Sequence, residues 1–388
     1  MLRRSHVLLA AALLAACKES RRGTPSSSSA STTASSPASA PPSGALTDEE
    51  RALAAEAEKA ALATDSYVGV PNGHFGALNE RLRAHPRVLV QLASASTEPQ
   101  VVVSALGELA SYALDGVDPK VDAKPAFFAR LSDPSLAIRG AALQAAAFVG
   151  PYVGFGDTDA ELAGKLADHC QHEAHPTIRA AACASLASRA RHDADRTAEV
   201  ESVMVVALED SSAFVVGRTL GNLITWCSPK LMEAYLTLAK GNEPIVRGYA
   251  AVGLGSCLGE HRESVVGALE AMLRDASPFV EADAAFALGL HASWSSVDLV
   301  LPLLEDERVA TTTPMAFTEV RLDGEGKAQW RIGYNESVAH EAMEGLVHAA
   351  SGATPMFIPE DDKDLARTKK QFVAWWKANK GRLIAKGS

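Results

Sequence analysis

The sequence predicts an all-α fold, an α-solenoid of stacked helical hairpins. One pattern of small and apolar residues recurs between residues 86 and 350, and its members are spaced as on one face of a helix. The composition agrees, because 47% hydrophobic residues against 22% charged residues are enough apolar material for a sizeable core. A chain of this composition is not disordered as a whole.

The repeat is clearest when it is read in columns. The first column position falls at Val102, Arg139, Arg179, Val216, Arg247, Glu281 and Ala339. Three residues further on, the side chain is small each time, and four and seven residues further on it is mostly Ala or Leu. This spacing marks one helix face, and small residues on it let a neighbouring helix approach closely. Each such helix B follows another amphipathic stretch, helix A, and stacked pairs bury apolar faces that one pair cannot.

The segments PTIRAAACASL, PIVRGYAAVGLG, PFVEADAAFALG and DPSLAIRGAAL resemble HEAT repeats, in particular the HEAT-like repeats of phycobilisome lyases and many bacterial proteins. The family's arginine stands at Arg139, Arg179 and Arg247, and other residues replace it in the remaining repeats. The resemblance implies a solenoid whose concave surface is made by the B helices. It implies little about function, because this fold hosts scaffolds, carriers and a few enzymes.

The N-terminus reads MLRRSHVLLAAALLAACKES, and residues 1–16 are predicted to be a lipoprotein signal peptide. Its apolar run of roughly ten residues is too short for a membrane span, which needs roughly 20. The segment LAAC resembles the lipobox of bacterial lipoproteins, which implies cleavage before Cys17 and lipid attachment to it. Lys18, in place of aspartate, favours the outer membrane over the inner one by analogy with lipoprotein sorting. An ordinary secretory signal is the alternative.

Residues 17–46 are rich in Ser, Thr, Ala and Pro and are predicted to form a disordered tether, since they offer almost nothing to bury. Residues 47–85 are predicted to hold an N-terminal helix, which starts at a capping box of Thr47 and Glu50, and a capping loop. The solenoid follows at 86–350.

The last repeat is longer than the others, and its excess lies at about 311–333. Two alternating stretches there flank Asp323-Gly324-Glu325-Gly326, which predicts a β-hairpin insertion. A cap over the last helix pair and a partner-binding edge are both open roles. Residues 351–388 are predicted to form a C-terminal capping helix with an aromatic face of Phe372, Trp375 and Trp376.

The densest group of ligand-type side chains lies at 168–175, where His169, Cys170, His172 and His175 are candidate metal ligands. Imidazole and thiolate suit zinc or copper, although the spacing matches no strong zinc signature. A solvated, His-rich turn between two helices is the alternative interpretation.

Catalytic motifs are not found, so we expect no enzyme activity and no cofactor. His172-Glu173 and His340-Glu341 resemble the His-Glu dyads of HEAT-repeat deoxyhypusine hydroxylases. That family needs four dyads in two pairs, and the sequence lacks the others. No catalytic residue of the phycobilisome lyases can be carried over either.

The chain has five cysteines, and lipidation of Cys17 leaves four in an oxidising compartment, where disulfides form. Cys227 and Cys257 lie at similar heights on adjacent B helices and are a candidate disulfide. Cys183 falls in a packing column, so we expect it to be a small buried residue.

The net charge of −10 is opposite to what a nucleic-acid partner requires. Arg139, Arg179, Arg247, Glu281 and Asp283 are the candidate binding surface, with a solvated face as the alternative. The sequence therefore predicts a non-catalytic, lipid-anchored scaffold or adaptor of the bacterial cell envelope, facing the periplasm or the exterior, whose partner is another protein. A metal-binding protein or metal-dependent enzyme using 168–175 is the first rival, and a purely structural envelope protein is the second.

Overall fold

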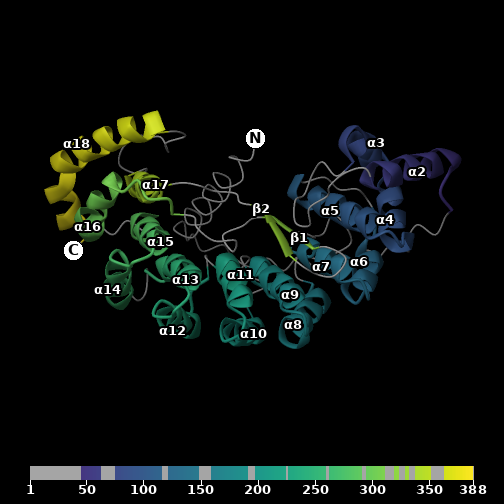
Figure 1. Ribbon diagram of the computed structural model, residues 1–388, viewed down its shortest axis with the longest axis horizontal. Helices are drawn as coiled ribbons and strands as arrows, with labels where there is room; N and C mark the ends of the chain where they lie inside the picture. Colours follow the sequence, from purple (N-terminus) through teal and green to yellow (C-terminus); the bar gives the residue numbers. More distant parts are fainter. Residues whose placement is uncertain are drawn as a thin grey trace, which may run out of the picture. The chain divides into compact units, whose positions relative to one another are not determined.

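The repeat unit is a helical hairpin, and successive hairpins stack in two rows of helices in the computed structural model (Figure 1). The A helices are α4 (Pro86–Ala95), α6 (Lys124–Leu131), α8 (Ala160–His172), α10 (Ala198–Leu208), α12 (Pro229–Leu238) and α14 (Arg262–Met272). The B helices are α5 (Pro99–Asp115), α7 (Leu136–Ala145), α9 (Pro176–Arg189), α11 (Ala213–Leu223), α13 (Pro244–Ser256), α15 (Pro278–Leu290) and α17 (Val338–Ala350). Each B helix packs against the next, and α5 to α15 each pack against the A helix that precedes them. The chain is therefore an all-α, solenoid-like helical repeat.

The structure describes residues 45–62, 75–115, 121–147, 159–190, 197–223, 226–258, 262–290, 294–310, 319–322, 328–331, 337–350 and 362–387. These residues belong to the unit Gly44–Ser388. The predicted signal peptide and nearly all of the predicted tether lie outside them. Within these ranges, no helix combines the length and the apolar character that a membrane crossing needs.

The small-residue column forms the contact between the helix rows. Its members are all fully buried: Ala105, Ala142, Ala182, Thr219, Ala250, Ala284 and Ala342. The apolar residues four positions later in each B helix are buried as well, with no more than 1% of their surface exposed. Small side chains bring the helix axes close, and the larger side chains beside them fill the remaining space.

Short elements lie at both ends of the stack. At the N-terminal end these are α2 (Asp48–Leu62), η1 (Gly76–Leu78) and α3 (Asn79–Ala84). The capping box of α2 forms, because the Thr47 N–H donates to Glu50 Oε2 at 2.9 Å and the Glu50 N–H donates to Thr47 Oγ1 at 3.2 Å.

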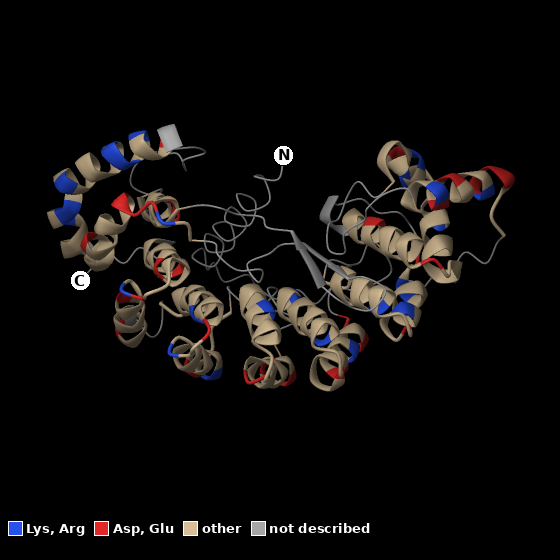
Figure 2. Cartoon of the chain, viewed as in Figure 1, with Lys and Arg blue, Asp and Glu red and all other residues tan. Residues whose placement is uncertain are grey.

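At the C-terminal end, η4 (Trp294–Ser296), α16 (Val297–Val300) and η5 (Leu301–Glu305) precede the last B helix, and α18 (Asp362–Gly387) follows it. Phe372 and Trp376 of α18 are buried, and Trp376 Nε1 donates to Asp298 Oδ1 at 2.9 Å. An aromatic face of α18 thus packs against the stack. The rest of α18 is rich in lysine and arginine, as Figure 2 shows.

Two short strands interrupt the helices between η5 and α17. β1 (Glu319–Leu322) pairs antiparallel with β2 (Ala328–Arg331), and an isolated bridge joins Val309 to Ser337 at their base. The predicted turn at 323–326 lies outside the described residues, as do the side chains of both strands. The packing of the insertion is therefore not part of the described core.

Candidate functional site

The column arginines lie where one repeat meets the next. Arg179 donates from Nε and Nη2 to the two carboxylate oxygens of Asp210, at 2.7 and 3.1 Å. Its Nη1 donates to the backbone carbonyl of Glu173 at 2.7 Å. Glu173 lies in the turn between α8 and α9, and Asp210 lies in the corresponding turn of the next repeat. One guanidinium therefore ties two consecutive turns together through a bidentate pair, the strongest geometry for such a contact.

The same arrangement recurs in other repeats. Arg247 donates to both oxygens of Asp275, at 2.8 and 2.7 Å, and to the carbonyl of Gly241 at 3.0 Å. Arg139 donates to Glu173 at 3.1 and 3.4 Å. We call these three contacts the arginine ladder. The arginine and carboxylate side chains are about 11 to 15% exposed, so they face the chain rather than solvent.

The carboxylates of the ladder are held in their charged form. Burial by itself would raise the pKa of Asp210, but hydrogen bonds from Arg179 and from the Ser212 N–H hold that pKa below its ordinary value. Asp275 behaves in the same way with Arg247. The ladder therefore contributes stability at neutral pH.

In the repeat of α15 the charges of the ladder are reversed, because the acid Glu281 takes the column position of an arginine. Arg308, from the turn after η5, donates from Nη2 to Glu281 Oε2 and from Nε to Asp306 at 3.0 Å. Burial raises the pKa of Glu281 even though Arg308 opposes it. Where the column holds Val102, Arg130 of the next A helix donates to the carbonyls of Ala93, Ser94 and Ser96.

These contacts change the interpretation of the candidate binding surface. Arg139, Arg179, Arg247 and Glu281 were considered for recognition of a partner, and each one is engaged within the chain. Asp283 is the member of that set without such a contact among the described residues.

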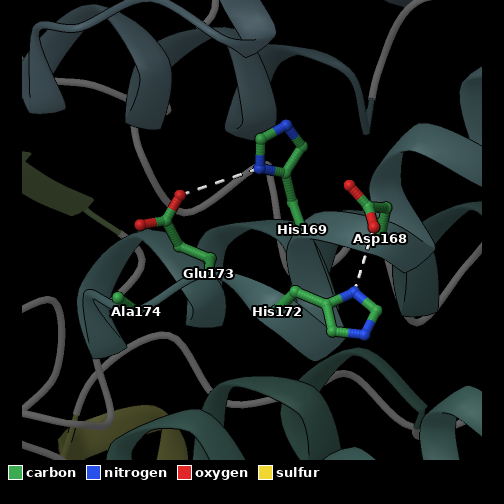
Figure 3. Close-up of a pocket in the computed structure, with 5 residues that line it drawn as sticks. All are labelled: Asp168, His169, His172, Glu173 and Ala174. Carbon is green, nitrogen blue, oxygen red and sulfur yellow. Dashed lines mark hydrogen bonds and ion pairs between the residues drawn. The ribbon is translucent and has the colours of Figure 1, made fainter.

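The histidine-rich turn lies at the end of α8 and in the link to α9. Asp168, His169, His172, Glu173 and Ala174 line one pocket there, as Figure 3 shows. His169 Nδ1 lies 3.7 Å from Glu173 Oε2, while His172 Nδ1 lies 3.0 Å from Asp168 Oδ1. The two imidazoles point in different directions, each toward its own carboxylate (Figure 3).

The other two candidate ligands do not join them. The sulfur of Cys170 is bonded to that of Cys183, and His175 stands at the N-cap position of α9, where its side chain makes no capping hydrogen bond and its Nδ1 is buried. Ligands must converge within about 2.0 to 2.3 Å of a zinc ion. No group of three or more His, Cys, Asp or Glu side chains in the described part of the chain is arranged to hold a metal. The metal hypothesis thus has no ligand set in these ranges.

The four cysteines of the repeat form two disulfides. Cys227 and Cys257, the pair that the sequence suggested, have an S–S distance of 2.03 Å. Cys170 and Cys183 join helix A to helix B of one hairpin, with their Cα atoms 4.7 Å apart. Cys183 is buried as expected from its column, but its bond to Cys170 was missed. A usable signal was present, because position 183 faces the last turn of the preceding A helix. Cys17 lies outside the described residues.

A second set of polar residues lies two positions after the column start. In the first three B helices this position holds Ser104, Ala141 and Ala181. In the last of the seven it holds Glu341, and in the three before that it holds Arg218, Tyr249 and Asp283, which we call the B-face polar row. A side chain two residues further along a helix points about 200° away from the first, toward the side opposite the packing face. The B helices carry few other charges along their length (Figure 2).

Glycines shape the surroundings of this row. A Cβ at Gly221 would lie 3.7 Å from the ring of Tyr249, so this ring lies over the backbone of α11. A Cβ at Gly248 would lie 2.6 Å from Asp283 Oδ2 and 2.3 Å from the ring of Phe279. Only glycine at position 248 leaves room for both side chains. The rings of Tyr249 and Phe279 meet edge to face, with centroids 5.7 Å apart.

The row also contains a carboxyl group whose pKa is strongly raised. Burial raises the pKa of Asp283 to about 8. Burial raises the pKa of Tyr249 as well, and the nearby Asp283 adds to this effect. Sequence reasoning named Asp283 but missed Arg218 and Tyr249. Comparing the position two residues after each column start would have found them.

Comparisons with known proteins add no activity. No protein-family model and no curated protein matches the chain. Among solved structures, YibA of Escherichia coli is 13% identical with a TM-score of 0.44, over 76% of this chain and 95% of that one. An engineered protein is 18% identical with a TM-score of 0.41, over 82% and 78%. Human deoxyhypusine hydroxylase, in a complex with glycerol, is 15% identical with a TM-score of 0.30, over 78% and 100%. At such values these likenesses carry no argument, and the fold rests on the helix packing described above.

Proposed function

We propose that this chain is a lipid-anchored, non-catalytic helical-repeat scaffold of the bacterial cell envelope that binds another protein along its B helices. The observation that carries the proposal is the B-face polar row, which crosses three consecutive repeats on the side away from the packing column. The arginine ladder and the buried columns account for the other conspicuous charged and small residues of the repeat. The polar row belongs to neither of these two sets.

A protein partner suits this surface better than a small substrate does. Stacked repeats present a long surface made of one short stretch from each repeat, which matches an extended partner. The net charge of −10 favours a partner with a neutral or basic contact patch. Cross-linking in cells followed by mass spectrometry tests this. One recurrent partner supports the scaffold, and its absence supports a purely structural envelope protein.

The location in the cell envelope is part of the same proposal. The LAAC segment supports lipidation at Cys17, and the Ser/Thr/Pro/Ala-rich residues that follow support a tether between the lipid and the repeat. Lys18 supports the outer membrane. Growth with a radiolabelled fatty acid tests the anchor, since the label is expected on the wild-type chain and lost in Cys17→Ala. Label retained in that variant contradicts lipidation at this residue.

The insertion at 311–333 is proposed to be a β-hairpin, which the pairing of β1 with β2 supports. Its role as a cap or as a partner-binding edge is tested by replacing it with a short Gly/Ser linker. A lower thermal midpoint identifies a cap. An unchanged midpoint with loss of the cross-linked partner identifies a binding edge.

A further inference from the structure

We infer that Asp283 receives a basic side chain, a lysine ammonium or an arginine guanidinium, from the protein partner. The inference rests on the proposed function and deepens it, because it assigns the contact and the chemistry of the partner residue. It starts from a buried carboxyl group that no cation in the described part of the chain contacts.

The carboxyl group of Asp283 is buried although the residue keeps part of its surface exposed. Its Oδ2 has no hydrogen-bond partner in the described part of the chain. Buried polar atoms are nearly always hydrogen-bonded, and an unsatisfied one destabilises the folded state. A donor that arrives with a partner would remove this penalty, so the site favours a ligand that brings its own hydrogen-bond donor.

Other acids of the repeat show that Asp283 is an exception. Glu173, Asp210 and Asp275 each accept from a ladder arginine, and Glu281, two residues before Asp283 on the same helix, accepts from Arg308. For Asp283, burial is the cause of the raised pKa, and no cation in the described part of the chain offsets it. Among the described residues, each of these four acids therefore has a cation partner, and Asp283 has none.

The walls of the site favour a cation over a neutral donor. The ring of Phe279 and Oδ2 of Asp283 both lie against the backbone of Gly248, and the ring of Tyr249 meets that of Phe279 edge to face. Aromatic faces attract ammonium and guanidinium groups, and the attraction is strongest where water is excluded. The apolar rings also suit the methylene stem of a lysine or arginine. A long basic side chain can thus place its charge on the carboxylate and its stem on the rings.

The first experiment compares three full-length chains by cross-linking in cells. They are the wild type, Asp283→Asn, which keeps the shape and removes the group that can become negatively charged, and Asp168→Asn as a matched control. Asp168 lies at the end of α8 with 72% of its side chain exposed. We expect the cross-linked partner to persist in the control and to fall about tenfold or more in Asp283→Asn, because a charge-assisted hydrogen bond contributes about 1.5 to 3 kcal/mol.

A partner captured equally by Asp283→Asn overturns the inference and leaves the scaffold function standing. If no chain captures a partner, the scaffold function fails, and a second experiment decides the inference. In it, purified full-length protein is titrated with the peptide acetyl-Gly-Lys-Gly-amide and with its norleucine counterpart. The ¹³C-carboxyl signals of aspartate are followed by NMR.

We expect the lysine peptide to shift the signal that is absent in Asp283→Asn, and the norleucine peptide to leave it in place. Equal responses to both peptides, or no response to either, overturn the inference. Asp283 is then only a buried acid that carries a proton. The thermal midpoint of Asp283→Asn serves as the folding control, and it is expected to equal or exceed that of the wild type.

Discussion

A close approach between two B helices gives a test of the stack. A Cβ at Gly289 of α15 would lie 2.3 Å from the carbonyl carbon and 2.7 Å from the Cα of Gly345 in α17. In return, a Cβ at Gly345 would lie 2.8 Å from the Cα of Phe286. These are backbone atoms, which cannot rotate aside, so Gly289→Ala must push α15 and α17 apart. The required shift is about 1 Å, since ordinary contacts begin at 3.4 Å.

The magnitude follows from two opposing effects. Overpacking of a close contact destabilises by about 1 to 3 kcal/mol, and the upper end applies where only backbone can move. The higher helix propensity of alanine offsets up to about 1 kcal/mol of this loss in stability. We expect Gly289→Ala to lower the free energy of unfolding by about 2 kcal/mol. The loss should concentrate in the C-terminal repeats, because each repeat contacts only its neighbours.

Gly267→Ala in α14 is the matched control, since a Cβ there meets nothing within 4 Å. This variant is expected to gain about 0.5 to 1 kcal/mol from helix propensity alone. Urea unfolding followed by circular dichroism at 222 nm measures both changes. If Gly289→Ala, like the control, proves as stable as the wild type or more stable, the close contact is refuted, and with it the packing of the last repeats.

Three further predictions concern charges and disulfides. Arg179→Ala is expected to destabilise by about 2 kcal/mol at pH 7, because it leaves Asp210 half-buried without its cation. Since the folded-state pKa of Asp210 is lowered, this difference should fade as the pH falls below about 4, and a pH-independent difference would contradict it. Asp283 has a folded-state pKa raised to about 8, so the wild type should lose up to about 1.4 kcal/mol per pH unit relative to Asp283→Asn between about pH 4 and 8. Parallel stability curves of these two proteins from pH 5 to 9 would show that this carboxyl is not buried. Replacing Cys227 and Cys257 together by serine should destabilise by about 3.5 kcal/mol, as expected for a closed loop of 30 residues, and disulfide mapping by mass spectrometry of the unreduced wild type should find this pair.

The ladder illustrates what the arrangement of repeats adds to a local pattern. Arg179 and Asp210 are 31 residues apart, and nothing near either one in the sequence identifies the other as its partner. At Glu281 the sequence shows an acid where the family has an arginine, which made this residue a candidate for the binding surface. Arg308 comes 27 residues later and turns that acid into part of the internal ladder.

The all-α repeat itself was determined by the sequence alone. A helix face with a small residue three positions after each column start depends only on local spacing, and every one of those residues is fully buried. Which side chains meet across repeats was decided by the tertiary structure, because the register between stacked hairpins depends on how their side chains fill the space between helices. That register pairs Arg179 with Asp210 and Arg247 with Asp275, and it places Asp283 Oδ2 against the backbone of Gly248.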